Sequence, residues 1–411
     1  GFIEGQEWAG LTGTRFSQGG GYLPVTCNLA GASGSYNGWT DHASGGSTHG
    51  GESGGNGYTW DTSPTITHTN DVFDGIKIKH LPCKLYFNTA NGLKIDGVQL
   101  KEIENLVICG PGFAESGTAT VPTTFTGVQV INEGSLNKST NFNVVGFGTG
   151  ILADGNSTAT VNGTVVSNCK YGFKCNDDSN MSANYSIASG CHQGYKSTAN
   201  SNMENRYSIA VANEDSGNIC TMNSYMDSSH SLSCLNGGHG WEVVGNSTAR
   251  LTGVDLTNEM YYGDESETLI DSAGGTVDAR YGWSDKTGAI AFRNSKSGVY
   301  CENSTVYATN ARSTYNLQSG FLVDRKGNLD ANYANSFYNG LATTSGIAGT
   351  TASGFVVRNN STGTIMNSTN NQNYHYGIYA DYGSKILASG ASAGAGAGST
   401  YGYFSDKDSH I

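Results

Sequence analysis

Hydrophobic and polar positions alternate within an eight-residue pattern that recurs along most of the chain. The pattern opens with glycine at position 1, has apolar or small residues at positions 2 and 4 and polar or mixed residues at positions 3 and 5, and closes with serine at position 8. Alternation of this kind predicts a short strand with one buried face. Clear copies begin at Gly150, Gly172, Gly194, Gly217, Gly240, Gly354, Gly377 and Gly402.

The copies follow one another at a short and regular spacing. With weaker copies at Gly127, Gly263, Gly298 and Gly320, most neighbouring glycines lie 22 or 23 residues apart. Such a period indicates stacked supersecondary units rather than a closed globule. A second apolar column, fifteen residues after the glycine, predicts at least one more strand in each unit. This column holds Val165, Ile187, Ile209 and Leu232.

The turn residues agree with a stack of strands. Position 7 is often asparagine or aspartate, as at Asn156 and Asp178, and these residues tolerate the left-handed αL conformation. The 59 glycines suit corners that require positive φ, and no segment has a convincing helical period. We therefore predict an all-β protein, a single-stranded parallel β-helix with about 22–25 residues per rung. Because this rung length is not a multiple of six, it favours the right-handed type over the left-handed hexapeptide type.

The repeats divide the chain into two predicted regions. Residues 1–75 are rich in glycine and have no period, which predicts an irregular N-terminal head over the open end of the solenoid. Residues 76–411 are predicted to form the β-helix, with loop insertions near 275–297 and 335–353. If both insertions left from the same side, they would wall a ligand groove over the rung 298–319. Both ends look cut, so we expect a piece of a longer chain.

Charge and composition limit the classes of partner. Only 14% of the residues are charged and 36% are hydrophobic, a balance that suits a narrow solenoid core whose backbone ladders satisfy most polar groups. The net charge of −12 argues against nucleic acid and against anionic membrane surfaces. No signal peptide or transmembrane run is visible, so we expect no membrane insertion. Neutral or polyhydroxylated ligands fit this composition better.

The nine cysteines are expected to be reduced. Cys175, Cys220 and Cys301 fall at position 4, where other repeats have small or apolar residues, so they are predicted to be small buried thiols. Cys169 and Cys191 lie one rung apart, at about the 4.8 Å strand spacing. A disulfide between them is geometrically feasible, although we favour free thiols.

The most unusual feature of the outward-facing positions is a column of acidic residues. Position 5 reads Glu267, Glu302 and Asp324 on three successive predicted rungs, with Glu265 and Glu242 at position 3 beside it. Like charges about 4.8 Å apart repel unless a proton, a cation or a substrate relieves them. Glycosidases use two carboxyl groups about 5–5.5 Å apart for retention and about 6.5–9.5 Å apart for inversion. One hypothesis makes Glu302 or Glu267 the general acid and Asp324 or Glu265 the base or nucleophile.

The alternative interpretation is a solvated polar ladder with no catalytic role. Asp154, Asp381 and Asp406 share position 5 far from this stretch, and outward-facing polar columns are common on solenoids. Sugar stacking would require exposed rings near the column. The candidate sugar-binding residues are Tyr300, Trp283, Tyr261, Tyr262 and Arg280, whereas Trp241 at position 2 is expected in the core.

The repeated pattern, the Asn/Ser/Gly/Thr-rich rungs and the irregular head resemble the right-handed parallel β-helix proteins of the pectin-lyase-like superfamily. Within that group the chain is most similar to bacteriophage tailspikes and tail fibres. The resemblance implies a homotrimer on a virion, outside the cell, which binds and often cleaves a bacterial surface polysaccharide and meets other tail proteins through its missing ends. A non-catalytic fibre or adhesin is the alternative, and a free secreted polysaccharide lyase or hydrolase comes third.

Two weaker features follow from the same resemblance. Gly238-His239-Gly240 is similar to the GHG triplet of polygalacturonases, with Glu214 and Asp215 about one rung earlier; the other motifs of that family are absent. Stacked carboxylates hold calcium in lyases of this fold, but the sequence has no calcium-loop motif. We therefore predict no metal site and no cofactor.

Overall fold

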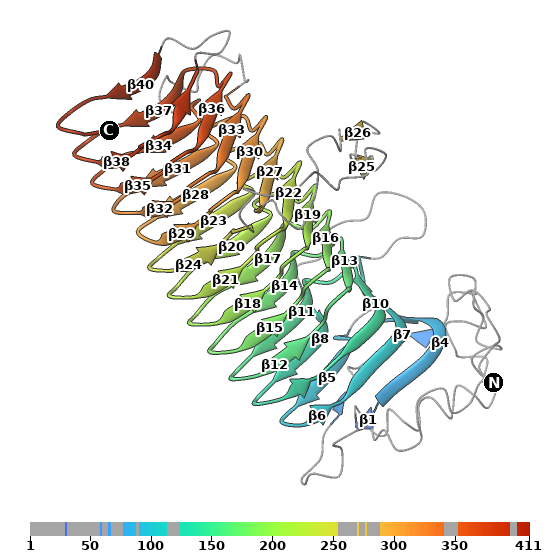
Figure 1. Ribbon diagram of the computed structural model, residues 1–411. Coiled ribbons are helices and arrows are strands. Elements are labelled where there is room, and N and C mark those ends of the chain that lie inside the picture. The colour runs from blue at the N-terminus through green and yellow to red at the C-terminus, as the bar shows by residue number, and fades with distance from the viewer. Residues whose placement is uncertain are drawn as a thin grey trace. The chain divides into compact units, whose positions relative to one another are not determined.

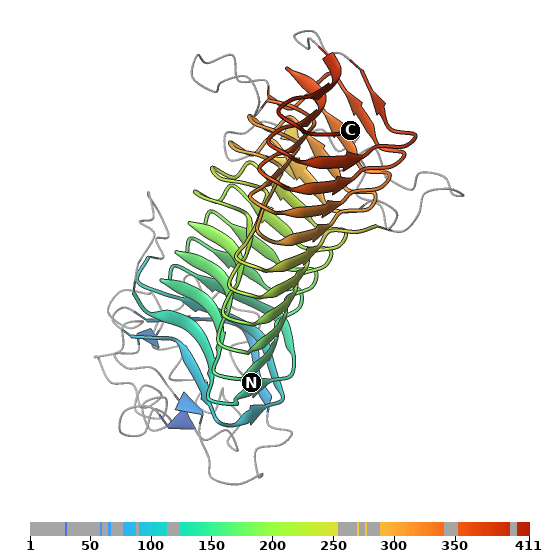
Figure 2. The same ribbon diagram turned by 90° about the vertical axis from the view of Figure 1, so that its left-hand side faces the viewer.

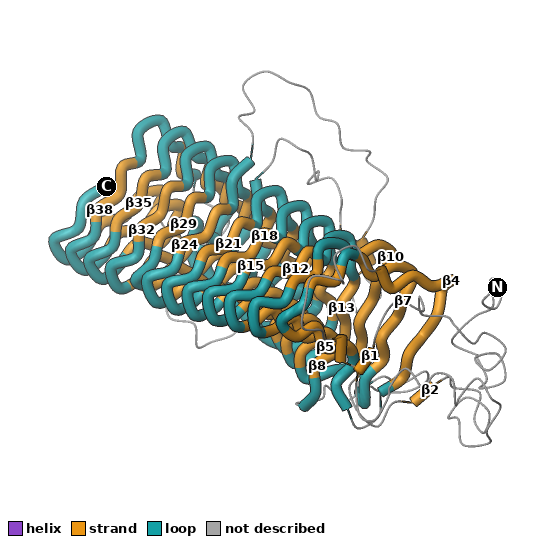
Figure 3. The backbone as a smooth tube through the Cα atoms, turned by 90° about the horizontal axis from the view of Figure 1, so that it is seen from below, coloured by secondary structure: helices purple, strands orange, loops and turns teal. Residues whose placement is uncertain are grey.

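The protein is a parallel β-helix, as the repeats predicted. The computed structural model describes residues 29–30, 58–59, 65–66, 77–87, 90–112, 124–253, 269–270, 276–277, 288–340, 352–394 and 401–411. These residues contain strands and turns and no helix (Figure 3). Within them no helix is long and apolar enough to cross a membrane. The chain divides into two compact units, residues 1–192 with 200–203 and residues 193–199 with 204–411.

Each rung has three strands, one in each of three sheets that we call A, B and C (Figure 1). In the first unit sheet A contains β5 (Leu93–Asp96), β8 (Thr126–Ile131), β11 (Thr149–Asp154) and β14 (Tyr171–Cys175). Sheet B contains β4 (Lys77–Tyr86), β7 (Glu102–Cys109), β10 (Ser139–Val145), β13 (Val165–Ser167) and β16 (Ile187–Ser189). Sheet C contains β6 (Gln99–Leu100), β9 (Ser135–Leu136), β12 (Thr158–Thr160) and β15 (Asn180–Ser182).

Short strands from the predicted head join the first rungs. β1 (Leu29–Ala30) pairs with β3 (Thr65–Ile66) in antiparallel fashion, β3 continues in parallel onto β5, and β2 (Tyr58–Thr59) pairs with β4. β18 (Asn202–Glu204) belongs to sheet C.

The second unit repeats the three-stranded rung (Figure 2). Its sheet A contains β17 (Gln193–Ser197), β20 (Asn218–Cys220), β23 (Trp241–Val244), β28 (Val299–Glu302), β31 (Phe321–Asp324), β34 (Phe355–Val357), β37 (Tyr376–Ala380) and β40 (Tyr401–Ser405). Sheet B contains β19 (Ile209–Val211), β22 (Leu232–Cys234), β27 (Ile290–Phe292), β30 (Arg312–Thr314), β33 (Asn335–Phe337), β36 (Thr369–Asn371) and β39 (Ser392–Ala393). Sheet C contains β21 (Tyr225–Asp227), β24 (Thr248–Arg250), β29 (Thr305–Tyr307), β32 (Asn328–Asp330), β35 (Thr362–Thr364) and β38 (Lys385–Leu387). A separate pair, β25 (Leu269–Ile270) and β26 (Thr276–Val277), is antiparallel.

Positions 7 and 8 of the repeat form the turn that leaves sheet A. The predicted αL conformation at position 7 is confirmed, for example at Asn156 (φ 58°) and Asp178 (φ 57°). The serine at position 8 points inward and forms a ladder, because the N–H of Ser157 donates to Oγ of Ser179 one rung later (3.0 Å). In the second unit Ser247 donates to Ser304 in the same way (3.1 Å).

The repeat glycine is required by close packing, whereas the positive φ expected of glycines at corners occurs elsewhere, for example at Gly155 (φ 64°) and Gly245 (φ 68°). A Cβ atom on Gly150 would lie 2.3 Å from Cγ1 of Val166, and one on Gly240 would lie 2.6 Å from the carbonyl oxygen of Gly298. Neither glycine has positive φ. Position 1 is therefore glycine because the backbones of adjoining strands leave no room for a side chain.

The second predicted apolar column lies on strands of sheet B, but one residue away from the core. Val165 pairs with Ile187, and Ile209 pairs with Leu232, in the expected register. The residues that point fully inward are their successors, such as Val166. The column itself faces outward, and in the second unit it contributes to an apolar cluster around Leu232, Cys234, Ile290 and Phe292.

A buried asparagine ladder runs through the second unit and was not predicted. Six asparagines occupy the corner that leads from sheet B to sheet A: Asn213, Asn236, Asn294, Asn316, Asn339 and Asn373. The Nδ2 of each of the first five donates to Oδ1 of the next asparagine at 2.9–3.0 Å, and that of the last donates to the carbonyl oxygen of Ser336 (3.0 Å). The residue before every ladder asparagine is in αL, which turns the amide inward. These preceding residues are Ala212, Leu235, Arg293, Tyr315, Tyr338 and Gln372.

The cysteines behave as predicted wherever they are described. Cys169 and Cys191 are buried free thiols, so no disulfide joins them. Cys175, Cys220 and Cys301 are buried at position 4. Burial raises the pKa of each of these three thiols to about 12, so they fill space and have no thiolate chemistry at neutral pH.

The strand register corrects the position of one predicted rung. Trp241 pairs directly with Val299, so the weak copy at Gly263 is not a rung between them. The extra residues lie between Gly253 and Gly288, because Ile290–Phe292, which we expected in a loop, form β27. This insertion leaves at the corner from sheet C to sheet B. The second insertion, between Gly340 and Ala352, leaves at the corner from sheet B to sheet A. They do not share a side of the rung, which was our condition for a groove.

Candidate functional site

The predicted site residues that the structure describes lie on sheet A of the second unit. They are Glu242 on β23, Tyr300 and Glu302 on β28, and Asp324 on β31. The other predicted catalytic residues, Glu265 and Glu267, lie outside the described residues, as do Tyr261, Tyr262, Arg280 and Trp283. Trp241 is 1% exposed, which confirms its predicted place in the core.

The predicted column of three acids is wrong at one end, because Glu302 has no acidic neighbour on the preceding strand. Glu302 pairs with Val244 on one side and with Asp324 on the other, so valine stands where Glu267 was expected. The column arose from counting Gly263 as a rung. Within the described residues, Glu302 and Asp324 remain adjacent, and two arginines relieve their repulsion.

Asp324 is a buried ion-pair residue. Its side chain is 4% exposed, and Oδ2 accepts hydrogen bonds from Nε (3.0 Å) and Nη2 (2.8 Å) of Arg358. Oδ1 accepts from the Asn359 amide and from the backbone N–H of Arg325 (2.9 Å). Both carboxylate oxygens are thus engaged. This arrangement suits a structural anchor rather than the base or nucleophile that we considered.

Glu302 is half-buried and reachable from solvent, since its side chain is 25% exposed. The hydroxyl of Tyr300 donates to Oε2, and Nη1 of Arg325 donates to Oε1. Burial, together with the hydrogen bond to Glu302, raises the pKa of Tyr300 above its ordinary value. Tyr300 therefore remains a hydrogen-bond donor across the neutral range. The residue predicted to stack on a sugar thus also holds the Glu302 carboxylate.

Glu242 lies beside Tyr300 on the same outward face. The two residues are direct partners in the parallel register. Oε2 of Glu242 accepts a hydrogen bond from Oγ of the buried Ser216 (2.8 Å). Since Glu302 lies two residues along the neighbouring strand, the Cα atoms of Glu242 and Glu302 are roughly 8 Å apart. The pair therefore spans Tyr300 diagonally.

His239 completes the cluster. Its ring stacks on that of Tyr300, with centroids 4.9 Å apart and planes inclined by 16°. Nδ1 accepts the backbone N–H of Ser297 (3.2 Å), so the neutral ring carries its proton on Nε2. Burial and the nearby Lys296 lower the pKa of His239 to about 4, although Asp215 opposes this shift.

The flanking glycines of His239 follow from packing. A Cβ atom on Gly238 would lie 2.6 Å from the backbone nitrogen of Ser216, and Gly240 faces Gly298. The triplet that resembles a polygalacturonase motif is therefore required by the stack. Its histidine nevertheless lies next to Tyr300, so the structure brings together two candidate groups that the sequence analysis treated separately.

His239 and Tyr300 lie together because of a contact that recurs between successive rungs. The residue before a repeat glycine touches position 3 of the following rung: Ser216 bonds to Glu242, and His239 stacks on Tyr300. Tyr376 likewise stacks on Phe404, with centroids 5.0 Å apart. Sequence reasoning missed Ser216 and Arg325 because it compared only positions 3 and 5. The signal was present in the polar residue that precedes the glycine.

A similar arrangement further along the unit is buried and structural. The hydroxyl of Tyr379 donates to Oδ2 of Asp381 (2.8 Å), and Nζ of Lys407 lies 3.8 Å from the same oxygen. Tyr379 and Asp381 are only 3% and 4% exposed. A tyrosine, an acid two residues later and a cation from the next rung thus also form a closed structural set. The set around Glu302 differs because the Glu302 side chain is 25% exposed.

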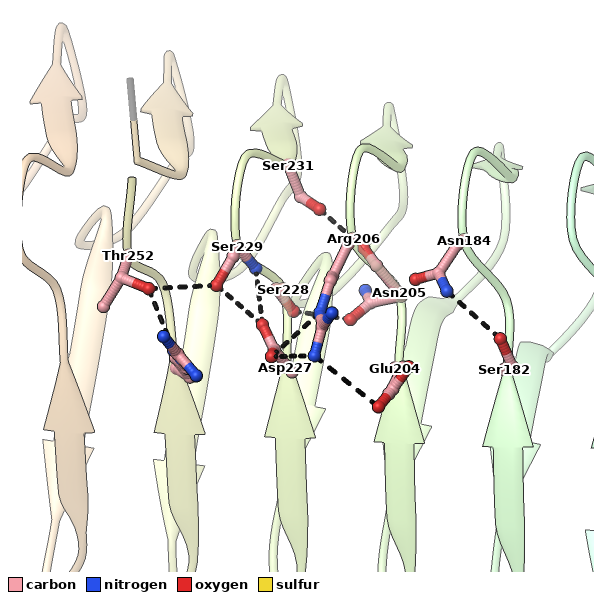
Figure 4. Close-up of polar contacts among 11 residues, drawn as sticks. Ser182, Asn184, Glu204, Asn205, Arg206, Asp227, Ser228, Ser229, Ser231 and Thr252 are labelled. Atoms are coloured by element: carbon pink, nitrogen blue, oxygen red, sulfur yellow. Dashed lines mark hydrogen bonds and ion pairs between the residues drawn. The ribbon is translucent and has the colours of Figure 1, made fainter. Parts of the chain in front are cut away.

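Another polar cluster ties rungs together at the ends of sheet C strands (Figure 4). Asp227 is 1% exposed and accepts hydrogen bonds from Nε of Arg206 (2.9 Å) and from Oγ of Ser229. Oγ of Ser229 lies 3.2 Å from Oγ1 of Thr252, which also accepts from Nε of Arg250. The cluster links successive rungs, and the carboxylate of Asp227 is fully engaged within it. Among the described residues, no group of three or more His, Cys, Asp or Glu side chains could hold a metal ion.

Comparison with known proteins gives a likeness of fold. No family model matches the chain, and no curated protein matches it. The A-module of the mannuronan C-5 epimerase AlgE4 from Azotobacter vinelandii is 14% identical, with a TM-score of 0.44 over 85% of this chain and 88% of that one. The AlgE6 A-module from the same organism is 16% identical, with a TM-score of 0.34 over 84% and 88%. We draw no functional conclusion from these likenesses.

Proposed function

We propose that the protein binds a bacterial surface polysaccharide over the outward face of sheet A in its second unit and hydrolyses it, in the manner of a phage tailspike. One observation carries the proposal: Glu242 and Glu302, both half-buried, flank Tyr300 on one open face. Their Cα atoms lie roughly 8 Å apart on adjacent strands, and an inverting pair needs two carboxyl groups on one surface about 6.5–9.5 Å apart, with room for a water molecule.

The hydrogen bonds favour distinct roles for the two carboxyl groups. Both oxygens of Glu302 accept hydrogen bonds, from Tyr300 and Arg325, an arrangement that suits a general base. Among the described residues Glu242 accepts a hydrogen bond at Oε2, from Ser216. Its Oε1 is the atom that presents a proton to the glycosidic oxygen. These roles differ from our first hypothesis, which had Glu302 or Glu267 as the acid.

The proposed hydrolysis uses Glu302 and Glu242 for its two proton transfers. Glu302 takes a proton from a water molecule, whose oxygen forms a bond to the anomeric carbon. The glycosidic C–O bond breaks, and the proton of Glu242 goes to the leaving oxygen. Tyr300 and Arg325 hold Glu302 in place, and Ser216 orients Glu242.

The test is to incubate the purified protein with a panel of bacterial capsules, O-antigens and exopolysaccharides and to follow new reducing ends. Glu242→Gln and Glu302→Gln should each reduce cleavage at least about 100-fold. Asp381→Asn is the matched control, because it alters the same position in the closed unit and should leave cleavage intact. Equal cleavage by all three variants would overturn the assignment.

A non-catalytic virion fibre is the second candidate. The closed Tyr379–Asp381–Lys407 set and the fully paired Asp324 favour it, since both show that acidic columns here can be structural. Binding to one glycan of the panel without new reducing ends would select this function. A homotrimer and a place on the virion, with tail proteins as partners, belong to either version and rest on the resemblance of the repeats to tailspikes. Sedimentation at one chain per particle would contradict the trimer.

A further inference from the structure

Two lysine side chains converge on one tyrosine in the first unit. Tyr171 and Lys174 lie on the outward face of β14, beside Thr149 and Leu152 of β11. Nζ of Lys170 and Nζ of Lys174 each lie 5.4 Å from the centroid of the Tyr171 ring. All three residues are half-buried. The attraction of an ammonium group to the negative face of a ring holds each lysine in this position.

Neither ammonium group has a carboxylate partner within 4 Å among the described residues. Other lysines of the first unit do: Lys94 lies 2.7 Å from Asp96, and Lys138 lies 2.8 Å from Glu102. Asp154 is the acidic residue nearest to Lys174 on β11, but its Oδ1 accepts the Asn176 amide (2.6 Å). Each ammonium group lies 5.4 Å from the centroid of the same ring. The two positive charges repel each other, and an anion that contacts both would relieve that repulsion.

We infer that Lys170, Tyr171 and Lys174 form a binding site for the anionic group of a sugar, a carboxylate or a phosphate. Tyr171 presents the two ammonium groups, and they supply charge-assisted hydrogen bonds to the anion. The net charge of −12 favours neutral ligands, so this site makes acidic glycans acceptable through local charge. The inference takes from the proposed function only that the ligand is a glycan.

The experiment measures binding of the full chain by calorimetry at low and at physiological salt. The probes are polygalacturonate oligomers for carboxylate and yeast phosphomannan for phosphate, with dextran and methyl-esterified polygalacturonate as neutral counterparts. We expect at least one acidic probe to bind more tightly than the neutral ones. Lys170→Gln and Lys174→Gln should each weaken that binding about tenfold, whereas Tyr171→Phe should retain most of it because the ring remains.

Lys94→Gln is the matched control. Lys94 lies in the same outward column of sheet A, since it pairs with Gln129, which pairs with Leu152 and so leads to Lys174, but it already has a carboxylate partner. The site is overturned if Lys94→Gln weakens binding as much as Lys174→Gln, if neutral probes bind equally well, or if neither acidic probe binds. Cleavage of the polysaccharide panel is scored separately, so a failure here leaves the proposed function standing, and the reverse also holds.

Discussion

The imidazole of His239 lies almost parallel to the phenol ring of Tyr300, at 4.9 Å between centroids. His239 precedes a repeat glycine and Tyr300 is at position 3 of the next rung, so their contact follows from the rung geometry. The same contact places Ser216 against Glu242. The two carboxyl groups of the candidate site and the residues that hold them, from Ser216 to Arg325, therefore come from four successive rungs.

The stability of the protein should fall with acid because of His239. Its pKa in the folded protein is lowered to about 4, while in the unfolded chain it is near 6.5. The unfolded state therefore binds a proton first as the pH drops. Stability from this group is present above pH 6.5 and declines between pH 6.5 and 4, by at most about 1.4 kcal/mol per pH unit. Urea unfolding from pH 7.5 to 4.5 should show this decline in the wild type and less of it in His239→Gln. Parallel curves for the two proteins would contradict it.

Replacing Asp324 should affect stability rather than chemistry. Asp324→Asn leaves Arg358 without its buried anion, and we expect a loss of about 2 kcal/mol or more in the free energy of unfolding, reduced from a fully buried case because Arg358 is partly exposed. Residual cleavage per folded molecule should be unchanged. Asp330→Asn provides the control, because the new amide oxygen can still accept the hydrogen bond from Asn332 and no ion pair is lost among the described residues. A loss of activity without a loss of stability would return Asp324 to the catalytic set.

The asparagine ladder should contribute strongly to the second unit. Asn316→Leu would leave the N–H and Nδ2 groups of Asn294 without their acceptor, and each buried unsatisfied donor costs about 1–3 kcal/mol. We expect a clear fall in the thermal midpoint. Asn246→Gly replaces an exposed αL turn residue that glycine accommodates, so its midpoint should stay close to the wild-type value. Similar midpoints for the two variants would refute a special role of the ladder.

The packing role of the repeat glycine can be separated from backbone flexibility. In Gly240→Ala the new methyl group would meet the Gly298 carbonyl at 2.6 Å, so the strands must move apart, at a cost of about 1–3 kcal/mol. Gly163 has positive φ and open space around it. Gly163→Asn should therefore cost only a few tenths of a kcal/mol. Chemical denaturation of both variants measures the difference, and equal losses would disprove the packing explanation.

The turn residues and the core positions of sheet A could be predicted from the sequence. Asn156 and Asp178 are in αL because a short polar side chain favours that conformation wherever the chain turns. The core positions of sheet A, including Trp241 and Cys301, followed from strict alternation.

Contacts between rungs were less predictable. Asn213 and Asn156 look alike in the sequence, yet Asn213 joins the buried ladder and Asn156 is exposed. Asn156 is itself in αL, whereas at Asn213 only the preceding residue, Ala212, is. The weak repeat at Gly263 imitated a rung, and only the pairing of Trp241 with Val299 removes it. That error also produced the three-acid column. Arg325 and Arg358 pair with Glu302 and Asp324 from the following rungs. These ion pairs can be placed only when the strand register is known.

The asparagine ladder passes both insertions of the second unit without interruption. Asn236 bonds to Asn294 across 58 residues of sequence, and Asn339 bonds to Asn373 across 34, at the same 2.9–3.0 Å as in rungs of normal length. The Nδ2 groups of the first five asparagines all donate toward the next rung. Which asparagines become neighbours in space therefore does not depend on the length of chain between them. The segments inserted at these two corners can change in length and sequence while the hydrogen bonds inside the unit stay the same.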